Sequence, residues 1–196
     1  MKRIPLISLL LLAVIFTVSA DRRRMLMTRS VATGGACSTV HVQNSNAEAS
    51  KPNIGDAVGT YYAGLGQYNP GANISVCKVD FILNKYSGTL VGKTFNCVIY
   101  AMSGNNFTGA VLGTSDNVAG VDWVDQSVTF TFASPVAINN GGSYAIALTM
   151  NTTDASNFGE FSASASDPIS GSYFSWNSAG TQVGFSTADP RITIYK

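Results

Sequence analysis

The chain has 196 residues, with 12 lysines and arginines, 11 aspartates and glutamates, and a formal net charge of +1. Half of the basic residues lie in the first 29 positions, so residues 30–196 carry six basic against ten acidic side chains, a net charge of −4. This part of the chain has no basic cluster, so it is a poor candidate for binding an anionic membrane surface, and nucleic acid is excluded as a partner. Its length fits one globular domain.

The first twenty residues have the layout of an export signal. A basic head, Met1–Arg3, precedes the apolar run Ile4–Val18, and small residues end the stretch at Ala20. This layout predicts a signal peptide over residues 1–20 and a secreted protein. The basic triplet Arg22–Arg24 follows at once. It leaves two alternatives open, an uncleaved anchor or a short pro-segment cut at a basic site.

Residues 21–56 are rich in serine, threonine, asparagine and glycine, with only a weak strand pattern at 37–43. Because this composition buries little apolar surface, we expect an extended or weakly structured N-terminal segment. The segment suits self-association, in which it adds a strand to the sheet edge of a second copy. Residues 57–70 follow with an aromatic cluster.

From residue 74 onward, apolar and polar residues alternate in short runs separated by turn residues. Val79, Phe81 and Leu83, for example, alternate with Asp80 and Ile82. Side chains of a strand point alternately to its two faces, so one face of these strands lies in a core. The opposite face also carries apolar residues, so part of it is covered as well. The predicted strands are 74–84, 95–102, 110–114, 127–133, 143–150, 159–164, 173–176, 182–185 and 191–195.

This series of short strands, without a helical pattern after the signal, predicts an all-β fold. We expect an antiparallel β-sandwich of the jelly-roll type over residues 57–196. No internal repeat is visible, which argues against a propeller or solenoid. The residues expected at or near the core are Val79, Phe81, Leu83, Ile99, Phe130, Phe132, Ala145 and Ile146. Ala145 and Ile146 are neighbours, so a regular strand cannot turn both inward.

The chain contains three cysteines, Cys37, Cys77 and Cys97. In an oxidising compartment an odd number allows one internal disulfide and one leftover thiol. Cys77 and Cys97 fall on the inward faces of two adjacent predicted strands, and we take this pair as the candidate disulfide. The alternatives are a bridge from Cys37 to either of them, or three small buried thiols. The absence of a Cys-x-x-Cys or His/Cys cluster argues against a zinc site.

Several strand and turn motifs resemble those of a bacterial surface module. They are Val76–Leu83, Gly88–Leu90, Val98–Ala101, Gly113–Ser115, Val128–Phe132, Gly141–Ile146, Tyr173–Trp176 and Ile192–Tyr195. Over residues 58–196 the chain resembles the choice-of-anchor domain. It is also similar in organisation to jelly-roll carbohydrate-binding modules. The resemblance implies a sandwich that binds glycans at a cell surface, and such modules often hold a structural calcium ion.

Catalytic signatures are weak. The single histidine, His41, has no nucleophile near it in sequence, and no Gly-x-Ser-x-Gly turn is present. A glycosidase needs two facing carboxylates, and nothing selects such a pair among Asp122, Asp125, Glu160 and Asp167. We therefore expect a non-catalytic protein.

The best local constellation is Asp122-Trp123-Val124-Asp125. The carboxylates of Asp122 and Asp125 are candidate ligands for Ca²⁺, which prefers oxygen ligands on loops. The alternative is two solvated carboxylates that flank a tryptophan packed on the sheet edge.

Aromatic residues near predicted loops are candidates for glycan binding, because sugar rings stack on them while neighbouring polar side chains bind the hydroxyls. We select Trp123, Trp176, Tyr173 and Tyr61, with Asn177 as a polar neighbour of Trp176. The alternative is that these rings plug the ends of the sandwich.

Three Asn-x-Ser/Thr triplets are candidate glycosylation sites, at Asn73, Asn106 and Asn151. Taken together, the sequence predicts a secreted, non-catalytic module whose partner is a polysaccharide or cell-surface glycan, with a role in binding or adhesion. A structural subunit of an extracellular fibre, coat or surface layer is the first alternative, and a glycan-active enzyme is the second.

Overall fold

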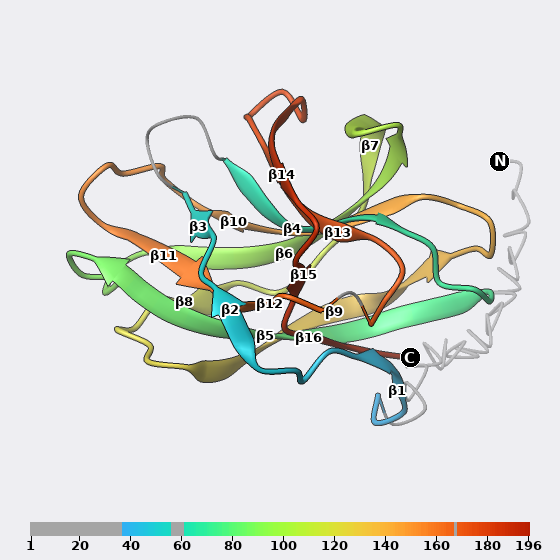
Figure 1. Cartoon of the computed structure of the whole chain (residues 1–196), viewed down its shortest axis with the longest axis horizontal. Helices are drawn as coiled ribbons and strands as arrows, with labels where there is room; N and C mark the ends of the chain where they lie inside the picture. Colours follow the sequence, from blue (N-terminus) through green and yellow to red (C-terminus); the bar gives the residue numbers. More distant parts are fainter. Residues whose placement is uncertain (1–36, 56–60, 167) are drawn as a thin grey trace, which may run out of the picture. The chain divides into compact units, whose positions relative to one another are not determined.

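The computed structural model describes residues 37–55, 61–166 and 168–196, and every regular element within these ranges is a strand (Figure 1). The strands pair antiparallel in two large sheets and one small one. The prediction of an all-β antiparallel sandwich is thus confirmed. The predicted signal peptide and residues 21–36 lie outside the described residues.

The six-stranded sheet is built around one long strand, β5. The strand β9 pairs along one edge of β5, while β16 and β11 share the other edge, and β1 and β3 extend these two. The strands are β1 (Val40–Gln43), β3 (Asn53–Ile54), β5 (Ile74–Ser87), β9 (Gln126–Ile138), β11 (Phe158–Phe161) and β16 (Ile192–Tyr195).

The seven-stranded sheet has the order β14-β13-β4-β10-β6-β7, with β8 paired to β6. Its strands are β4 (Tyr62–Tyr68), β6 (Thr94–Ser103), β7 (Asn106–Thr114), β8 (Val118–Ala119), β10 (Tyr144–Met150), β13 (Ser172–Trp176) and β14 (Gln182–Ser186). The small sheet comprises β2 (Glu48–Ser50), β12 (Ala163–Ser164) and β15 (Asp189–Pro190). Most successive long strands switch from one large sheet to the other, as the crossing connections of a jelly roll require.

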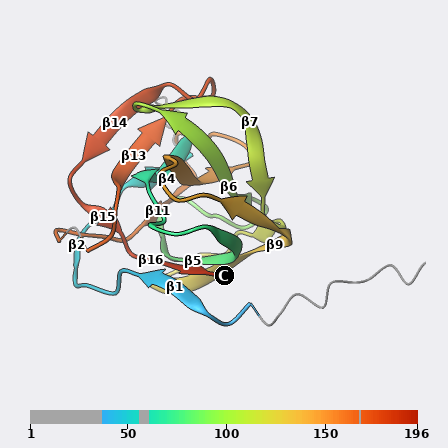
Figure 2. The same ribbon diagram turned by 90° about the vertical axis from the view of Figure 1, so that its right-hand side faces the viewer.

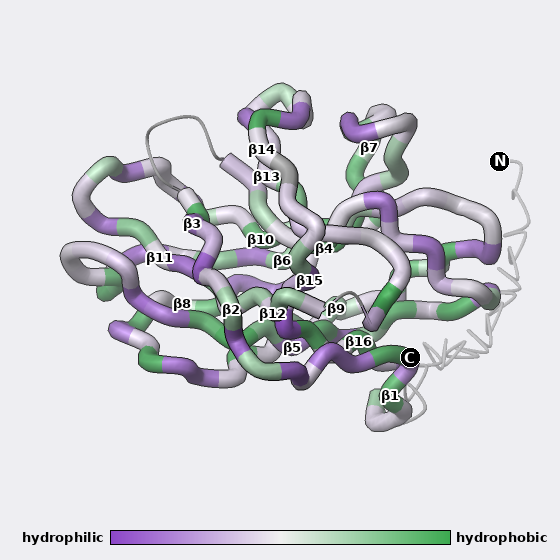
Figure 3. The backbone as a smooth tube through the Cα atoms, in the orientation of Figure 1, coloured by the Kyte–Doolittle hydropathy of each residue, from purple (hydrophilic) through white to green (hydrophobic). Residues whose placement is uncertain are grey.

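The main core lies between the two large sheets. Figure 2 shows them as two layers, with β1, β16, β5 and β9 below and β4, β6 and β13 above. Val79, Phe81 and Leu83 of β5 are buried there with Phe130 and Ile99. Their polar neighbours point outward, and hydrophobic and hydrophilic residues accordingly alternate along the tube in Figure 3. The predicted period-two pattern places these residues correctly.

A second, smaller core covers the outer face of the seven-stranded sheet. It consists of Val98, Tyr100, Met102, Ala145, Ala147, Phe174 and Trp176, with Tyr62 and Phe107 packed against it. This core explains why both faces of β6 and β10 are apolar. It also explains how the neighbours Ala145 and Ile146 can both be buried on a regular strand. Ile146 faces the main core, and Ala145 faces the second core on the opposite side of the sheet.

The edges of the seven-stranded sheet close over this second core. The β6–β7 hairpin meets the turn between β13 and β14, where the Phe107 N–H donates to the Gly180 carbonyl at 3.0 Å. The Gln182 N–H donates to the Asn106 side chain at 2.9 Å. Figure 2 shows β7 and β14 on the same side of the sheet.

Residues 57–70 have an aromatic cluster but no predicted strand, whereas the structure contains the strand β4 within them. Glycine weakens a strand pattern, and β4 contains Gly64 and Gly66. Both are needed for close packing: a Cβ atom at Gly64 would collide with the Ile146 carbonyl, and one at Gly66 with the Phe174 ring. The need for glycine at these two positions comes from Ile146 and Phe174, which are distant in sequence.

The paired strands begin at Val40, earlier than the predicted boundary at residue 57. β1 pairs with β16, and β3 pairs with β11 and buries Ile54 completely. Thus residues 37–55 of the 21–56 segment are built into the sheets. The polar composition of these residues gave no sign of the strands. Their pairing partners, β16 and β11, come from the C-terminal third of the chain, so no local pattern indicates the pairing.

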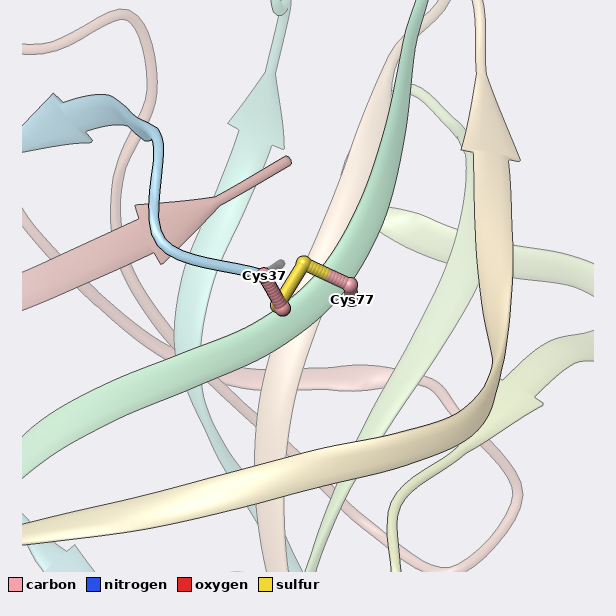
Figure 4. Close-up of a disulfide and its surroundings, with 2 residues drawn as sticks. All are labelled: Cys37 and Cys77. Atoms are coloured by element: carbon pink, nitrogen blue, oxygen red, sulfur yellow. A yellow bond between two sulfur atoms is a disulfide. The ribbon is translucent and has the colours of Figure 1, made fainter. Parts of the chain in front are cut away.

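The disulfide joins Cys37 to Cys77, with Cα atoms 5.9 Å apart (Figure 4). The predicted Cys77–Cys97 pair is therefore wrong, and Cys97 is a buried free thiol in the main core. The cause is a register shift in β5 between Val76 and Lys78, which breaks the alternation and places Cys77 outside the main core.

Candidate ligand-binding groove

The two tryptophans selected from the sequence are both buried, and they lie in different cores. Trp176 is 0% exposed in the second core, and its Nε1–H donates to the Asn105 carbonyl at 2.8 Å. Trp123 is 4% exposed in the main core, where its ring contacts Phe95 edge-on at 5.0 Å. The structure therefore does not bring them together as an exposed stacking platform.

The other selected residues are half-buried and serve the fold. Tyr61 packs edge-on against Tyr62, and Tyr173 packs against Phe161 at 5.7 Å. The Asn177 side-chain oxygen accepts hydrogen bonds from two backbone N–H groups of the β13–β14 turn, at 3.0 Å each. This contact shapes the turn that follows Trp176.

Asp122 and Asp125 are engaged by different partners. Asp122 accepts from the Leu90 N–H at 3.0 Å and lies 3.4 Å from Lys85 Nζ, contacts that lower its pKa. Asp125 lies 3.3 Å from Lys51 Nζ, and Asn84 and Lys51 lower its pKa. Asp125 has a φ of 44°, a left-handed conformation that aspartate tolerates, and its N–H donates to Asn84.

We expect added Ca²⁺ to leave the melting temperature unchanged, because each of these carboxylates already has a lysine partner. Among the described residues, no group of three or more histidine, cysteine, aspartate or glutamate side chains is placed to hold a metal ion. Thermal unfolding with millimolar Ca²⁺ and with a chelator measures the effect. A rise in melting temperature with Ca²⁺ that Asp122→Asn abolishes would contradict this expectation and establish a calcium site.

The three asparagines of the glycosylation triplets are all exposed. Their side-chain oxygens each accept a hydrogen bond from a backbone N–H group. Asn73 accepts from Asn140, Asn106 from Gln182, and Asn151 from Thr94. Glycan attachment uses the amide nitrogen, so it would leave these contacts in place.

A groove with a volume of about 210 Å³ lies on the outer face of the six-stranded sheet. The pairing register arranges its residues in rows across three strands. Asp80 of β5 is paired with Thr129 of β9 and Thr193 of β16. In the next row, Ile82 is paired with Ser127 and donates its N–H to the Arg191 carbonyl at 3.4 Å.

The segment that ends β1 forms another side of the groove. Gln43, Asn44 and Ser45 line it. The strand β1, which leads into them, lies next to β16 in Figure 1. Asn44 fixes this segment, because its buried side-chain nitrogen donates to Ser164 Oγ at 2.9 Å and to the Pro190 carbonyl at 3.0 Å. The groove is thus held on both sides by well-anchored backbone.

One end of the groove is a hydrogen-bonded array around Asp80. Its carboxylate accepts from Thr129 Oγ1 at 2.6 Å and from the Tyr195 hydroxyl at 2.8 Å. The Lys78 ammonium lies 4.0 Å from the centre of the Tyr195 ring. This end offers a carboxylate held in place by two donors beside an aromatic ring.

Sequence reasoning missed the groove because its residues come from four separate segments. Two signals were available. Lys78, Asp80 and Ile82 occupy the face of β5 opposite Val79 and Phe81, and Arg191 is the only arginine after residue 29. Neither signal identifies a site until the strand order is known.

No model of a known protein family matches the chain, and no curated protein matches it. Within the described residues, no helix is long and apolar enough to cross a membrane.

Proposed function

We propose that this protein is a secreted, non-catalytic module that binds a glycan in the groove on the outer face of its six-stranded sheet. The observation that carries the proposal is the composition of the groove. Hydroxyl, amide and carboxylate groups from Gln43, Ser45, Asp80 and Ser127 surround a cavity beside the Tyr195 ring. Sugars are recognised by such polar groups next to an aromatic side chain.

The size of the groove fits this role. A volume of about 210 Å³ is below the usual range for drug-sized ligands, so the groove accommodates one or two sugar units rather than a large cofactor. A shallow site that holds one unit of a long polymer suits adhesion to a polysaccharide or a cell-surface glycan. The export signal predicted at residues 1–20 is consistent with an extracellular partner.

The alternative of a structural subunit relied on residues 21–56 as a strand donor to a second copy. The described part of that segment already pairs within its own chain, through β1 and β3. This intramolecular pairing favours the binding module over the fibre or coat subunit.

Blocking the groove should abolish binding. We expect Ser127→Phe, which places a ring at an exposed position inside the groove, to weaken affinity for any glycan found on an array by at least about tenfold. Ser134→Phe is the matched control, because Ser134 is also exposed on β9 but does not line the groove. Affinity electrophoresis with the bound polysaccharide measures both variants.

Retained binding by Ser127→Phe, with its fold verified by circular dichroism, would disprove the groove as the binding site. If the wild-type protein bound no glycan on the array, the proposed function itself would fall.

A further inference from the structure

Arg191 is the one groove residue that carries a positive charge. It precedes β16, and its Nε atom is buried without a hydrogen-bond partner. None of the salt bridges formed by the described residues includes it. A donor nitrogen that is buried without an acceptor is costly, because it loses its hydration and gains no hydrogen bond in return.

Four lysines of the described residues differ from Arg191. Lys51, Lys85 and Lys93 each lie within 3.4 Å of a carboxylate oxygen, and Lys78 contacts the Tyr195 ring. Arg191 attracts the Asp125 carboxylate at longer range and so contributes to lowering the Asp125 pKa, but it forms no ion pair among the described residues. Its guanidinium is therefore available to an anion that enters the groove.

Resting on the proposed function, we infer that the groove selects an acidic saccharide, one whose carboxylate binds Arg191 while its hydroxyls bind the neighbouring polar groups. A guanidinium presents donors in a fork that matches the two oxygens of a carboxylate.

The second charge of the groove positions this ligand. Ile82 donates its N–H to the Arg191 carbonyl, and Asp80 lies two residues from Ile82 along β5. The row of residues that contains Arg191 and the row that contains Asp80 are therefore about 7 Å apart. Because Asp80 repels a carboxylate and accepts from hydroxyls, an acidic sugar can enter in one orientation only. Its acid group then lies at Arg191 and its hydroxyls at Asp80.

The net charge argues for specific recognition. Residues 30–196 carry a net charge of −4, so this part of the chain repels polyanions at long range. Binding of an acidic polymer therefore depends on a local contact, and Arg191 is the cation positioned to supply it.

The test uses one polymer in two charge states. We expect the wild-type protein to bind polygalacturonate, and to bind its fully methyl-esterified form about tenfold to hundredfold more weakly, because the ester removes the anion. Arg191→Gln should lower affinity for polygalacturonate by a similar factor, with Arg191→Lys in between. Lys93→Gln, which removes the same charge away from the groove, should bind as wild type.

Three outcomes would overturn the inference. If the wild-type protein bound the methyl-esterified polymer as tightly as polygalacturonate, the groove would bind glycans regardless of their charge. The proposed function would then remain intact. The attraction to polyanions would be non-specific if Lys93→Gln lowered affinity for polygalacturonate as much as Arg191→Gln does. The same would follow if the wild-type protein bound dextran sulfate as tightly as polygalacturonate. Binding of no saccharide in any form would remove the proposed function together with the inference. The comparison of the two polymers needs no variant, so the test does not depend on the folding of a mutant.

Discussion

Replacing Trp176 with alanine should lower the free energy of unfolding by about 3–5 kcal/mol, the usual cost of removing a large buried aromatic side chain. Trp176 is fully buried, stacks on Phe174 with ring centres 5.6 Å apart and donates its Nε1–H to Asn105. The substitution leaves a cavity in the second core and removes the hydrogen bond to the Asn105 carbonyl. Chemical denaturation followed by circular dichroism measures the change.

A matched control for this variant is Tyr86→Ala, since Tyr86 is 61% exposed. We expect it to cost less than about 1 kcal/mol. Folded Trp176→Ala protein should bind glycan as wild type, because the groove is on the other sheet. A variant that kept its stability and lost glycan binding would instead identify Trp176 as a stacking ring and refute the assignment of the site to the groove.

Removing the disulfide should cost about 4 kcal/mol. Cys37 and Cys77 are 40 residues apart, and closing a loop of that length lowers the entropy of the unfolded chain by a corresponding amount. We expect the double variant Cys37→Ser/Cys77→Ser to unfold at a lower denaturant concentration. It should also bind glycan more weakly, because the segment from Cys37 leads into β1 at the side of the groove.

Cys97→Ala provides the control, because Cys97 is a free thiol in the main core and forms no bridge. Burial raises the pKa of the Cys97 thiol, so this group is unreactive in the folded protein. Alkylation of the denatured, unreduced protein should therefore label Cys97 alone. A linked peptide that contains Cys77 and Cys97 would refute the observed pairing.

Local patterns were sufficient to predict most of the strands. The alternation of Val79, Phe81 and Leu83 identified β5 and its inward face, since that signal needs only the period of a strand. The strand β4 was missed because Gly64 and Gly66 are explained only by the residues that pack on them. The same limit applied to Cys77, whose orientation depends on a register shift against β9.

The site was harder to predict than the fold. Tryptophans are common in glycan sites, so Trp123 and Trp176 were reasonable candidates, but ring type alone does not reveal burial. The groove depends on strands β1, β5, β9 and β16 meeting on one face. Arg191 and Asp80 are more than a hundred residues apart, and no spacing in the sequence relates them.

The strand order also determines the sequence of events during synthesis and folding. β10 pairs with β4 on one side and β6 on the other, yet it is made after both. Until Met150 has left the ribosome, neither neighbour can complete its pairing, and both expose unpaired backbone N–H and C=O groups. β16, the most C-terminal strand of the described residues, likewise completes the groove face of β5. Folding then depends on contacts between distant parts of the chain, which makes it slow.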